Sequence, residues 1–121
     1  MFMTTGPGSM FGNHPVTMEH HVEWISDCIA HMLRHDFDLI EARADAENAW
    51  GQHVTDRAQR TVAHDTDSWW NGGNVPGKKR SALFYLGNFA QYRTWCDETA
   101  ARGYEGFTLT SRLPESAGLL P

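Results

Sequence analysis

The segment Ser68-Trp69-Trp70-Asn71-Gly72-Gly73-Asn74-Val75-Pro76-Gly77-Lys78-Lys79 is rich in Trp, Asn and Gly and separates the helical patterns of this 121-residue chain. Glycine costs backbone entropy in a helix or a strand, so a loop is expected from Asp65 to Gly77. Two adjacent indoles expose a large apolar area unless a partner covers them. We therefore expect this loop to be mobile or to face a ligand.

Helical spacing of apolar residues is found on both sides of the loop. A first helix is expected from Thr17, as N-cap, with apolar positions three and four apart. These positions are Val22, Ile25, Ile29, Met32 and Leu33. A second helix, from about Ala44 to Val62, carries one narrow stripe that would lie flat on a larger body. The stripe consists of Ala46, Trp50, Val54, Ala58 and Val62. Phe89, Tyr92 and Cys96 indicate a third helix that ends near Gly103.

Short strands complete the expected fold. Phe2–Thr5 has the pattern of the tail of a strand, Ser81–Leu86 that of a short buried strand, and Phe107–Leu109 that of a closing strand. The expected class is an α/β fragment, mainly helical with a few short strands. Residues 1–110 form one segment, and residues 111–121 have the composition of a flexible tail.

Composition excludes several classes of protein. Hydrophobic residues make up 40% of the chain, with five Trp and six Phe, which is too apolar for a disordered segment. The net charge is −5 and the basic residues are scattered, so nucleic acid is not an expected partner. No basic, apolar leader and no run of eighteen apolar residues is present, which favours a cytoplasmic protein without a membrane partner. Cys28 and Cys96 are expected to be reduced.

Gly72–Lys78 matches the pattern G-x-x-x-x-G-K of a phosphate-binding loop. Lys79 stands where a magnesium-binding Ser or Thr is required, and Pro76 has no amide hydrogen to offer a phosphate. The pattern therefore does not support a nucleotide triphosphatase.

His31 and His35 are one helical turn apart, a spacing that places two histidines on the same face of a helix, as in some metal sites. Two ligands do not make a site, and an H-E-x-x-H motif is absent from the sequence. A helical metal phosphohydrolase remains one alternative hypothesis, which metal analysis of the purified protein would test. The sequence assigns no metal ligand and no catalytic residue.

The loop resembles the Ser-Trp-x-x-Gly-x-Asn-x-Pro-Gly-Lys segment of Baeyer-Villiger monooxygenases, particularly the cyclohexanone monooxygenase group of class B flavoprotein monooxygenases. Further blocks in the same order resemble this family: Thr5–Pro15, His21–Ile25, Phe84–Gly87 and Gly103–Phe107. The resemblance runs from Met1 to about Thr110 and corresponds to the carboxy-terminal part of a family member. The family's two Gly-rich dinucleotide fingerprints, its F-x-G-x-x-x-H-x-x-x-W signature and its flavin-associated arginine have no counterpart in this sequence.

The resemblance implies the C-terminal portion of a flavoprotein with two dinucleotide-binding domains. Such an oxidoreductase uses FAD and NADPH to insert one oxygen atom of O2 into a ketone, which gives an ester or a lactone. Both cofactors would be held mainly by polypeptide outside this sequence. The implied partners are a small ketone and either the missing flavin domain or further copies of this chain. The fragment alone is expected to be inactive.

The resemblance also assigns roles to individual residues. Trp69 corresponds to the loop tryptophan that closes over NADP, and Asn74 to the polar residue that shapes the closed loop. His14 is expected beside the cofactor. The substrate pocket and flavin edge are expected to be lined by Phe11, Gly12, His14 and Phe84. The chain departs from the family pattern at Met10, His14 and Asn88, where proline, Leu or Met, and glycine are usual. Phe11 and Phe84 would otherwise be simple core residues.

An alternative from a different class is a stand-alone NADP-binding or regulatory module without chemistry. Binding of NADPH without flavin would favour this alternative. Under the fragment hypothesis, the isolated chain exposes a large apolar face and therefore aggregates, oligomerises or stays partly disordered.

Overall fold

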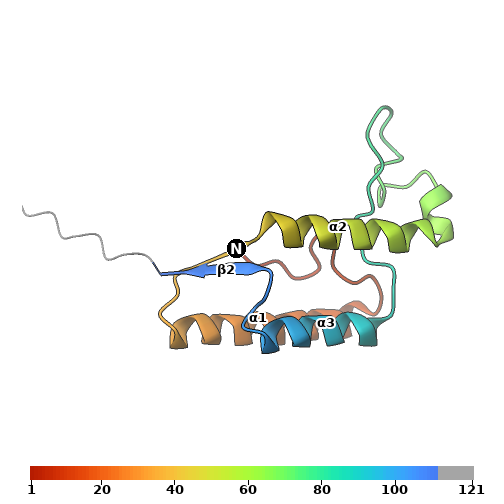
Figure 1. Cartoon of the computed structure of the whole chain (residues 1–121). Coiled ribbons are helices and arrows are strands. Elements are labelled where there is room, and N and C mark those ends of the chain that lie inside the picture. The colour runs from red at the N-terminus through yellow and green to blue at the C-terminus, as the bar shows by residue number, and fades with distance from the viewer. Residues whose placement is uncertain (112–121) are drawn as a thin grey trace, which may run out of the picture.

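Three helices and a two-stranded sheet make up this protein in a computed structural model that describes residues 1–111. The elements are α1 (His14–Arg34), β1 (Leu39–Ala42), α2 (Ala44–Gln59), the 3-10 helix η1 (Val62–Asp65), α3 (Phe89–Ala101) and β2 (Phe107–Thr110). Helices α1 and α3 lie side by side and form one layer, and α2 forms the other (Figure 1). The expected mainly helical fold with short strands is confirmed. Of the expected tail, residues 112–121 lie outside the described part of the chain.

The sheet joins the segment after α1 to the segment after α3. Strands β1 and β2 are antiparallel, with Leu39 opposite Thr110 and Ala42 opposite Phe107. The closing strand expected at Phe107–Leu109 is thus confirmed. Strand β1 was not expected, because it has only four residues and a single residue, Arg43, separates it from α2.

The core lies between α2 and α3, and two extended segments run through it. Its buried members are Met10, Val54, Tyr85 and Tyr92, with Trp50, Phe89 and Trp95 packed around them. The backbone N–H of Tyr85 donates to the carbonyl of Ser9 at 2.9 Å, and the N–H of Phe11 donates to the carbonyl of Tyr85 at 3.1 Å. This single parallel bridge replaces the two expected strands: Phe2–Thr5 is not a strand, and Ser81–Leu86 pairs only at Tyr85.

Gly8 is required where the N-terminal segment passes under α2. Its φ is +77°, and a Cβ at this position would lie 3.0 Å from the indole nitrogen of Trp50. That same Nε1 donates a hydrogen bond to the Gly8 carbonyl at 3.0 Å. Residue 8 therefore needs both a left-handed backbone and the absence of a side chain.

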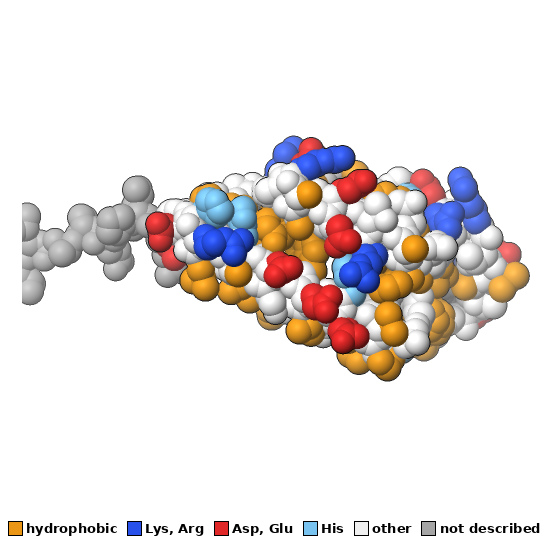
Figure 2. Space-filling model, turned by 90° about the horizontal axis from the view of Figure 1, so that it is seen from below, with side chains coloured by type: hydrophobic (Ala, Val, Ile, Leu, Met, Phe, Trp, Pro, Cys, Tyr) orange, Lys and Arg blue, Asp and Glu red, His pale blue; other side chains and the backbone are white. Residues whose placement is uncertain are grey.

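Helix α1 buries a different face from the one that its apolar spacing predicts. The helix begins at His14 with Asn13 as N-cap, so the expected N-cap at Thr17 is wrong. Its buried residues are Thr17, His20, His21 and Cys28. By contrast, Val22 is 53%, Ile29 43% and Leu33 73% exposed. In the layer formed by α1 and α3, hydrophobic side chains gather along one edge of the surface (Figure 2).

The expected stripe of the second helix is largely confirmed. Val54 and Ala58 are buried and Trp50 is half-buried, whereas Val62 belongs to η1 and is 85% exposed. The helix ends at Gln59, so its last turn is shorter than expected. Among the helices described here, none combines the length and the apolar content needed to cross a lipid bilayer.

Candidate functional site

The segment between η1 and α3 projects beyond α2 at one end of the molecule (Figure 1). It is a series of turns with positive φ at Gly72 (+76°) and Gly77 (+78°). No regular helix or strand forms between Thr66 and Ser81. The loop expected from the sequence is therefore present.

The carboxamide of the buried Asn71 anchors this loop. Its Nδ2 lies 2.8 Å from the carbonyl oxygen of Thr66 and 3.2 Å from that of Ala63. Its Oδ1 accepts a hydrogen bond from the N–H of Gly73 at 2.9 Å. A Cβ on Gly73 would lie 2.9 Å from the same Oδ1, so only glycine fits there. Asn71 thus holds the segment that leads into the loop, from Ala63 to Thr66, together with the turn after the two indoles.

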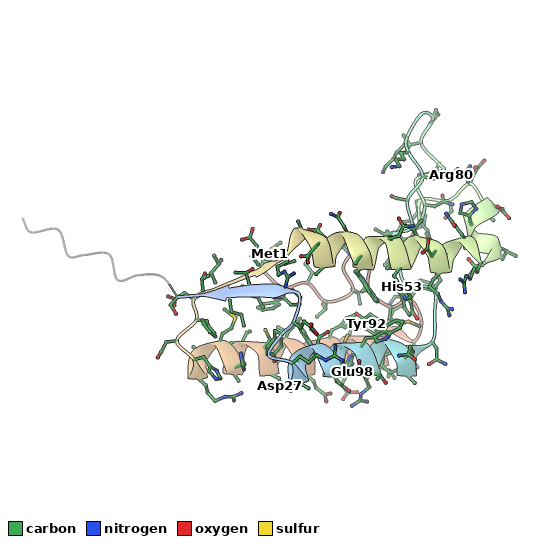
Figure 3. All side chains as sticks on the ribbon, viewed as in Figure 1. Met1, Asp27, His53, Arg80, Tyr92 and Glu98 are labelled. Carbon is green, nitrogen blue, oxygen red and sulfur yellow. The ribbon has the colours of Figure 1, made fainter. Side chains whose placement is uncertain are left out.

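A second contact closes the base of the loop. Arg80, which lies on the projecting loop (Figure 3), forms an ion pair with Asp67 across the two arms of the loop. The Arg80 guanidinium also lies 3.4 Å from the carbonyl oxygens of His64 and Thr66. All of these groups are at the surface, so the ion pair adds little stability and serves mainly to hold the two arms together.

Four aromatic side chains from distant parts of the chain meet beside the anchored loop. The ring of Phe11 lies 4.3 Å from Trp70 and 5.5 Å from Phe84, between ring centroids. Trp69 contacts Trp70 and Phe84 edge-on at 5.8 and 6.1 Å. These separations are typical of stabilising aromatic pairs. We call Phe11, Trp69, Trp70 and Phe84 the aromatic cluster.

Most of the residues expected at the site are in this cluster or next to it. His14 joins it through an edge-on contact with Phe11 at 5.6 Å. Gly12 lies between these two residues in the chain and is exposed. Asn74 is exposed further along the loop, away from the network that Asn71 makes. Asn71 was not singled out from the sequence, although an Asn two residues before a turn glycine is a known signal for a side chain that bonds its own backbone.

Trp69 remains largely uncovered. Its side chain is 60% exposed, whereas Trp70, Phe11 and Phe84 are half-buried. Within residues 1–111, its indole N–H has no hydrogen-bond partner. An exposed indole with a free donor is suited to cover a polar, partly aromatic ligand.

The cavity behind the aromatic cluster is small. Its volume is about 90 Å³, and Trp70, Asn71, Phe84 and Ala58 contribute to its lining. Pockets for small molecules commonly have volumes of roughly 300 to 1,000 Å³. Beside the aromatic cluster, the described residues therefore do not enclose a ligand site and form at most one wall of it.

The histidines do not form a metal site in the described chain. The centroids of the His31 and His35 rings are 4.3 Å apart with the rings tilted by 34°, and His35 Nδ1 lies 2.8 Å from the His31 carbonyl oxygen. Across residues 1–111, no group of three or more His, Cys, Asp or Glu side chains is placed to hold a metal ion.

Comparisons with known proteins place this chain beside flavin monooxygenases, although no family model matches it. The chain is 40% identical over 109 residues to cyclohexanone 1,2-monooxygenase of an Acinetobacter species, which covers 90% of this chain and 20% of that protein. It is 38% identical over 104 residues to an acetone monooxygenase (methyl acetate-forming) of a Gordonia species, which covers 86% of this chain and 20% of the relative. A relative from Byssochlamys spectabilis, 29% identical over 126 residues, is named an FAD-binding monooxygenase.

A solved structure gives the same result. The crystal structure of cyclohexanone monooxygenase from Rhodococcus sp. Phi1, bound to NADP+, superposes with a TM-score of 0.85 at 45% identity. The match covers 91% of this chain and 21% of that one. This chain thus spans about one fifth of the length of the relatives that it matches. Its homologues are Baeyer-Villiger and related flavin monooxygenases, and the resemblance noted in the sequence is confirmed.

Proposed function

We propose that this chain is a segment of an FAD- and NADPH-dependent Baeyer-Villiger monooxygenase, an enzyme that inserts one oxygen atom of O2 into a ketone. The observation that carries this proposal is the aromatic cluster with its exposed Trp69, which stands on a loop that resembles the family's nucleotide-covering loop. The sequence similarity to a cyclohexanone monooxygenase, which extends over 90% of this chain, also supports the proposal.

The residues present fit a nicotinamide nucleotide at one side only. Trp69 offers an exposed ring and a free N–H, and the anchoring of its loop by Asn71 holds that ring in place with little loss of freedom on binding. His14 lies beside Phe11 at the edge of the same surface, and Asn74 is the exposed polar residue of the loop. We infer that Trp69, His14 and Asn74 contact the nucleotide, and that the remainder of its site belongs to other polypeptide.

The fit to FAD is weaker, since no described residue forms a Gly-rich cradle at the start of a helix. When bound, the flavin and NADPH supply the electrons that reduce O2 for transfer of one oxygen atom to the ketone. The part of this chain is to cover the reacting groups and exclude water. Phe11, Gly12, His14 and Phe84 form the wall against which a cyclic or aryl ketone would pack, and the isolated chain is expected to be inactive.

The exposed apolar face of α1 supports the proposal that more polypeptide covers this chain. Exposed apolar residues follow one another at intervals of four and seven along the helix. They are Met18, Val22, Ile29 and Leu33. Burial of one such side chain contributes roughly 1.5 to 3 kcal/mol, so this face would add considerable stability to a longer enzyme. We infer that α1 packs on the flavin-binding part.

The proposal is tested in a chimera in which this chain replaces the matching fifth of the Acinetobacter cyclohexanone 1,2-monooxygenase. We expect the chimera to bind NADP+ and to oxidise cyclohexanone. Trp69→Ala should weaken NADP+ binding by about tenfold or more, because a covering indole is lost. Val75→Ala, at another exposed apolar residue of the loop, is the matched control and should change the affinity less than about twofold.

Two results would contradict the proposal. One is a chimera in which Trp69→Ala leaves both NADP+ affinity and turnover as they were. The other is NADPH binding by the isolated chain at the affinity of the chimera, which would instead favour a stand-alone nucleotide-binding module.

A further inference from the structure

A second hollow lies between α2 and α3, separate from the aromatic cluster. Its volume is about 620 Å³, which is in the range of small-molecule sites. His53 and Arg57 of α2 form one side, Asn88 and Gln91 at the start of α3 form the other, and Tyr85 and Trp95 contribute flat aromatic surface. In Figure 3, His53 lies between the two helices. We call this hollow the α2–α3 groove.

Two enclosed nitrogen atoms in this groove have no partner. They are Nε of Arg57 and Nε2 of His53, and neither forms a hydrogen bond within residues 1–111. An enclosed donor without an acceptor is costly, and more so when the donor is charged. Arg57, which lines the groove, therefore has one donor nitrogen without an acceptor.

Four arginines of the described chain form ion pairs with a nearby acid: Arg43, Arg80, Arg93 and Arg102. Arg57 forms no such pair within residues 1–111, and the groove is lined by neither Asp nor Glu. In a chain of net charge −5, this makes the α2–α3 groove locally favourable for an anion.

The start of α3 adds to the positive character of the groove. Asn88 caps the helix, and its Oδ1 accepts a hydrogen bond from the N–H of Gln91 at 3.2 Å. The first N–H groups of a helix carry a partial positive charge and favour anions nearby. Asn88, Ala90 and Gln91, at the start of this helix of 13 residues, line the groove.

The aromatic residues determine the shape of an occupant. The ring of His53 lies nearly parallel to Tyr85, at 20° and 5.7 Å, and meets Trp95 edge-on at 4.9 Å. Flat rings at these angles accept a further flat, apolar group. The groove thus combines a flat apolar surface with converging donors.

We propose that the α2–α3 groove binds a small organic anion, in which a carboxylate or a phosphate is attached to a flat apolar body. The anionic group pairs with Arg57 and the start of α3, and the body packs on His53, Tyr85 and Trp95. This site is independent of the nucleotide-covering role of Trp69.

The test is isothermal titration calorimetry of the full 121-residue chain with benzoate and with phenyl phosphate. Benzyl alcohol, which has the same ring and no charge, is the neutral comparison. We expect the anions to bind at least about tenfold more tightly than the alcohol, because each anion gains charge-assisted hydrogen bonds. Arg57→Gln should weaken both anions by about tenfold or more.

Matched variants identify the site. Arg60→Gln removes an exposed guanidinium from the C-cap of the same helix and should leave anion affinity unchanged. Trp69→Ala should leave it unchanged as well, which separates this proposal from the nucleotide role. His53→Phe keeps the ring but removes its nitrogen atoms, and it should weaken the anions more than the alcohol.

The proposal is overturned if benzoate and phenyl phosphate bind no better than benzyl alcohol, or if none of the three binds. It is also overturned if Arg57→Gln and Arg60→Gln have equal effects. Circular dichroism of each variant identifies a loss of folding, and the comparison of charged and neutral probes on the unchanged chain does not depend on any variant.

Discussion

Nε2 of His21 on α1 lies 2.9 Å from the phenol oxygen of Tyr92 on α3, inside the protein. The other ring nitrogen, Nδ1, accepts a hydrogen bond from the backbone N–H of Thr5 at 3.3 Å. A nitrogen that accepts carries no hydrogen, so the neutral ring donates through Nε2 to Tyr92. A second proton on this ring would break the contact with Thr5, and His21 therefore joins three separate parts of the chain only while it is neutral.

The first prediction concerns pH. Burial lowers the pKa of His20 and of His21 below the ordinary 6.5, and for His21 the neighbouring His20 adds to the effect. The unfolded chain thus takes up protons at a higher pH than the folded chain does. The free energy of unfolding should be highest above about pH 6.5 and should fall as the pH drops through the lowered values. Thermal melting from about pH 8 to about pH 5 measures this.

Two variants assign this pH dependence. His21→Gln should flatten it, because one group with a lowered pKa is gone. His64→Gln, at an exposed histidine of η1, should leave it as it is. If the melting temperature decreases by the same amount with falling pH in both variants, His21 does not cause the pH dependence.

The second prediction distinguishes two asparagines of the loop. Asn71→Ala removes the carboxamide that joins the carbonyls of Ala63 and Thr66 to the Gly73 turn. We expect a loss of about 1 to 3 kcal/mol and faster proteolysis within the loop, because buried backbone groups lose their partner. Asn74→Ala, at an exposed position, should change stability by less than about 0.5 kcal/mol. Equal cleavage rates in the two variants would contradict the anchoring role of Asn71.

The third prediction concerns the apolar face of α1. The isolated chain should self-associate through this face, as detected by sedimentation velocity at several concentrations. Val22→Glu combined with Ile29→Glu should shift the chain toward the monomer, because two exposed apolar residues of the face become charged. Asn48→Glu combined with Gln59→Glu adds the same charge on α2 and serves as the control. If the unaltered chain is a monomer that melts cooperatively, the need for a covering partner is contradicted.

The fourth prediction compares two glycines with opposite outcomes. Gly8→Ala places a Cβ 3.0 Å from the Trp50 indole at a φ of +77°, and should destabilise the chain by roughly 1 to 2 kcal/mol or more. Gly51→Ala lies within α2 with nothing within 4 Å of its Cβ, and should stabilise it by up to about 1 kcal/mol. Chemical denaturation of both variants provides the measurement. The same sign for both changes would contradict the packing described at Gly8.

Local patterns were sufficient for much of this protein. The helical spacing of apolar residues located α1, α2 and α3, and the glycines located the loop, because these signals depend on the backbone preferences of neighbouring residues. The motif around Trp69 indicated the monooxygenase relatives, and the structure brings Trp69, Phe11, Phe84 and His14 together. The roles of these residues remain predictions.

Other features depend on residues far apart in the chain. The sequence alone determined where helices and the loop form, and which relatives the chain resembles. That α1 turns Thr17 and His21 inward and leaves Val22 and Leu33 exposed could be seen only once the distant segments were placed together. The same is true of the pairing of β1 with β2, and of the finding that Arg57 forms no ion pair within residues 1–111. Burial and hydrogen bonding depend on which distant groups come into contact. The spacing of apolar residues in a helix does not distinguish the face that packs on its own chain from a face that would pack on another polypeptide.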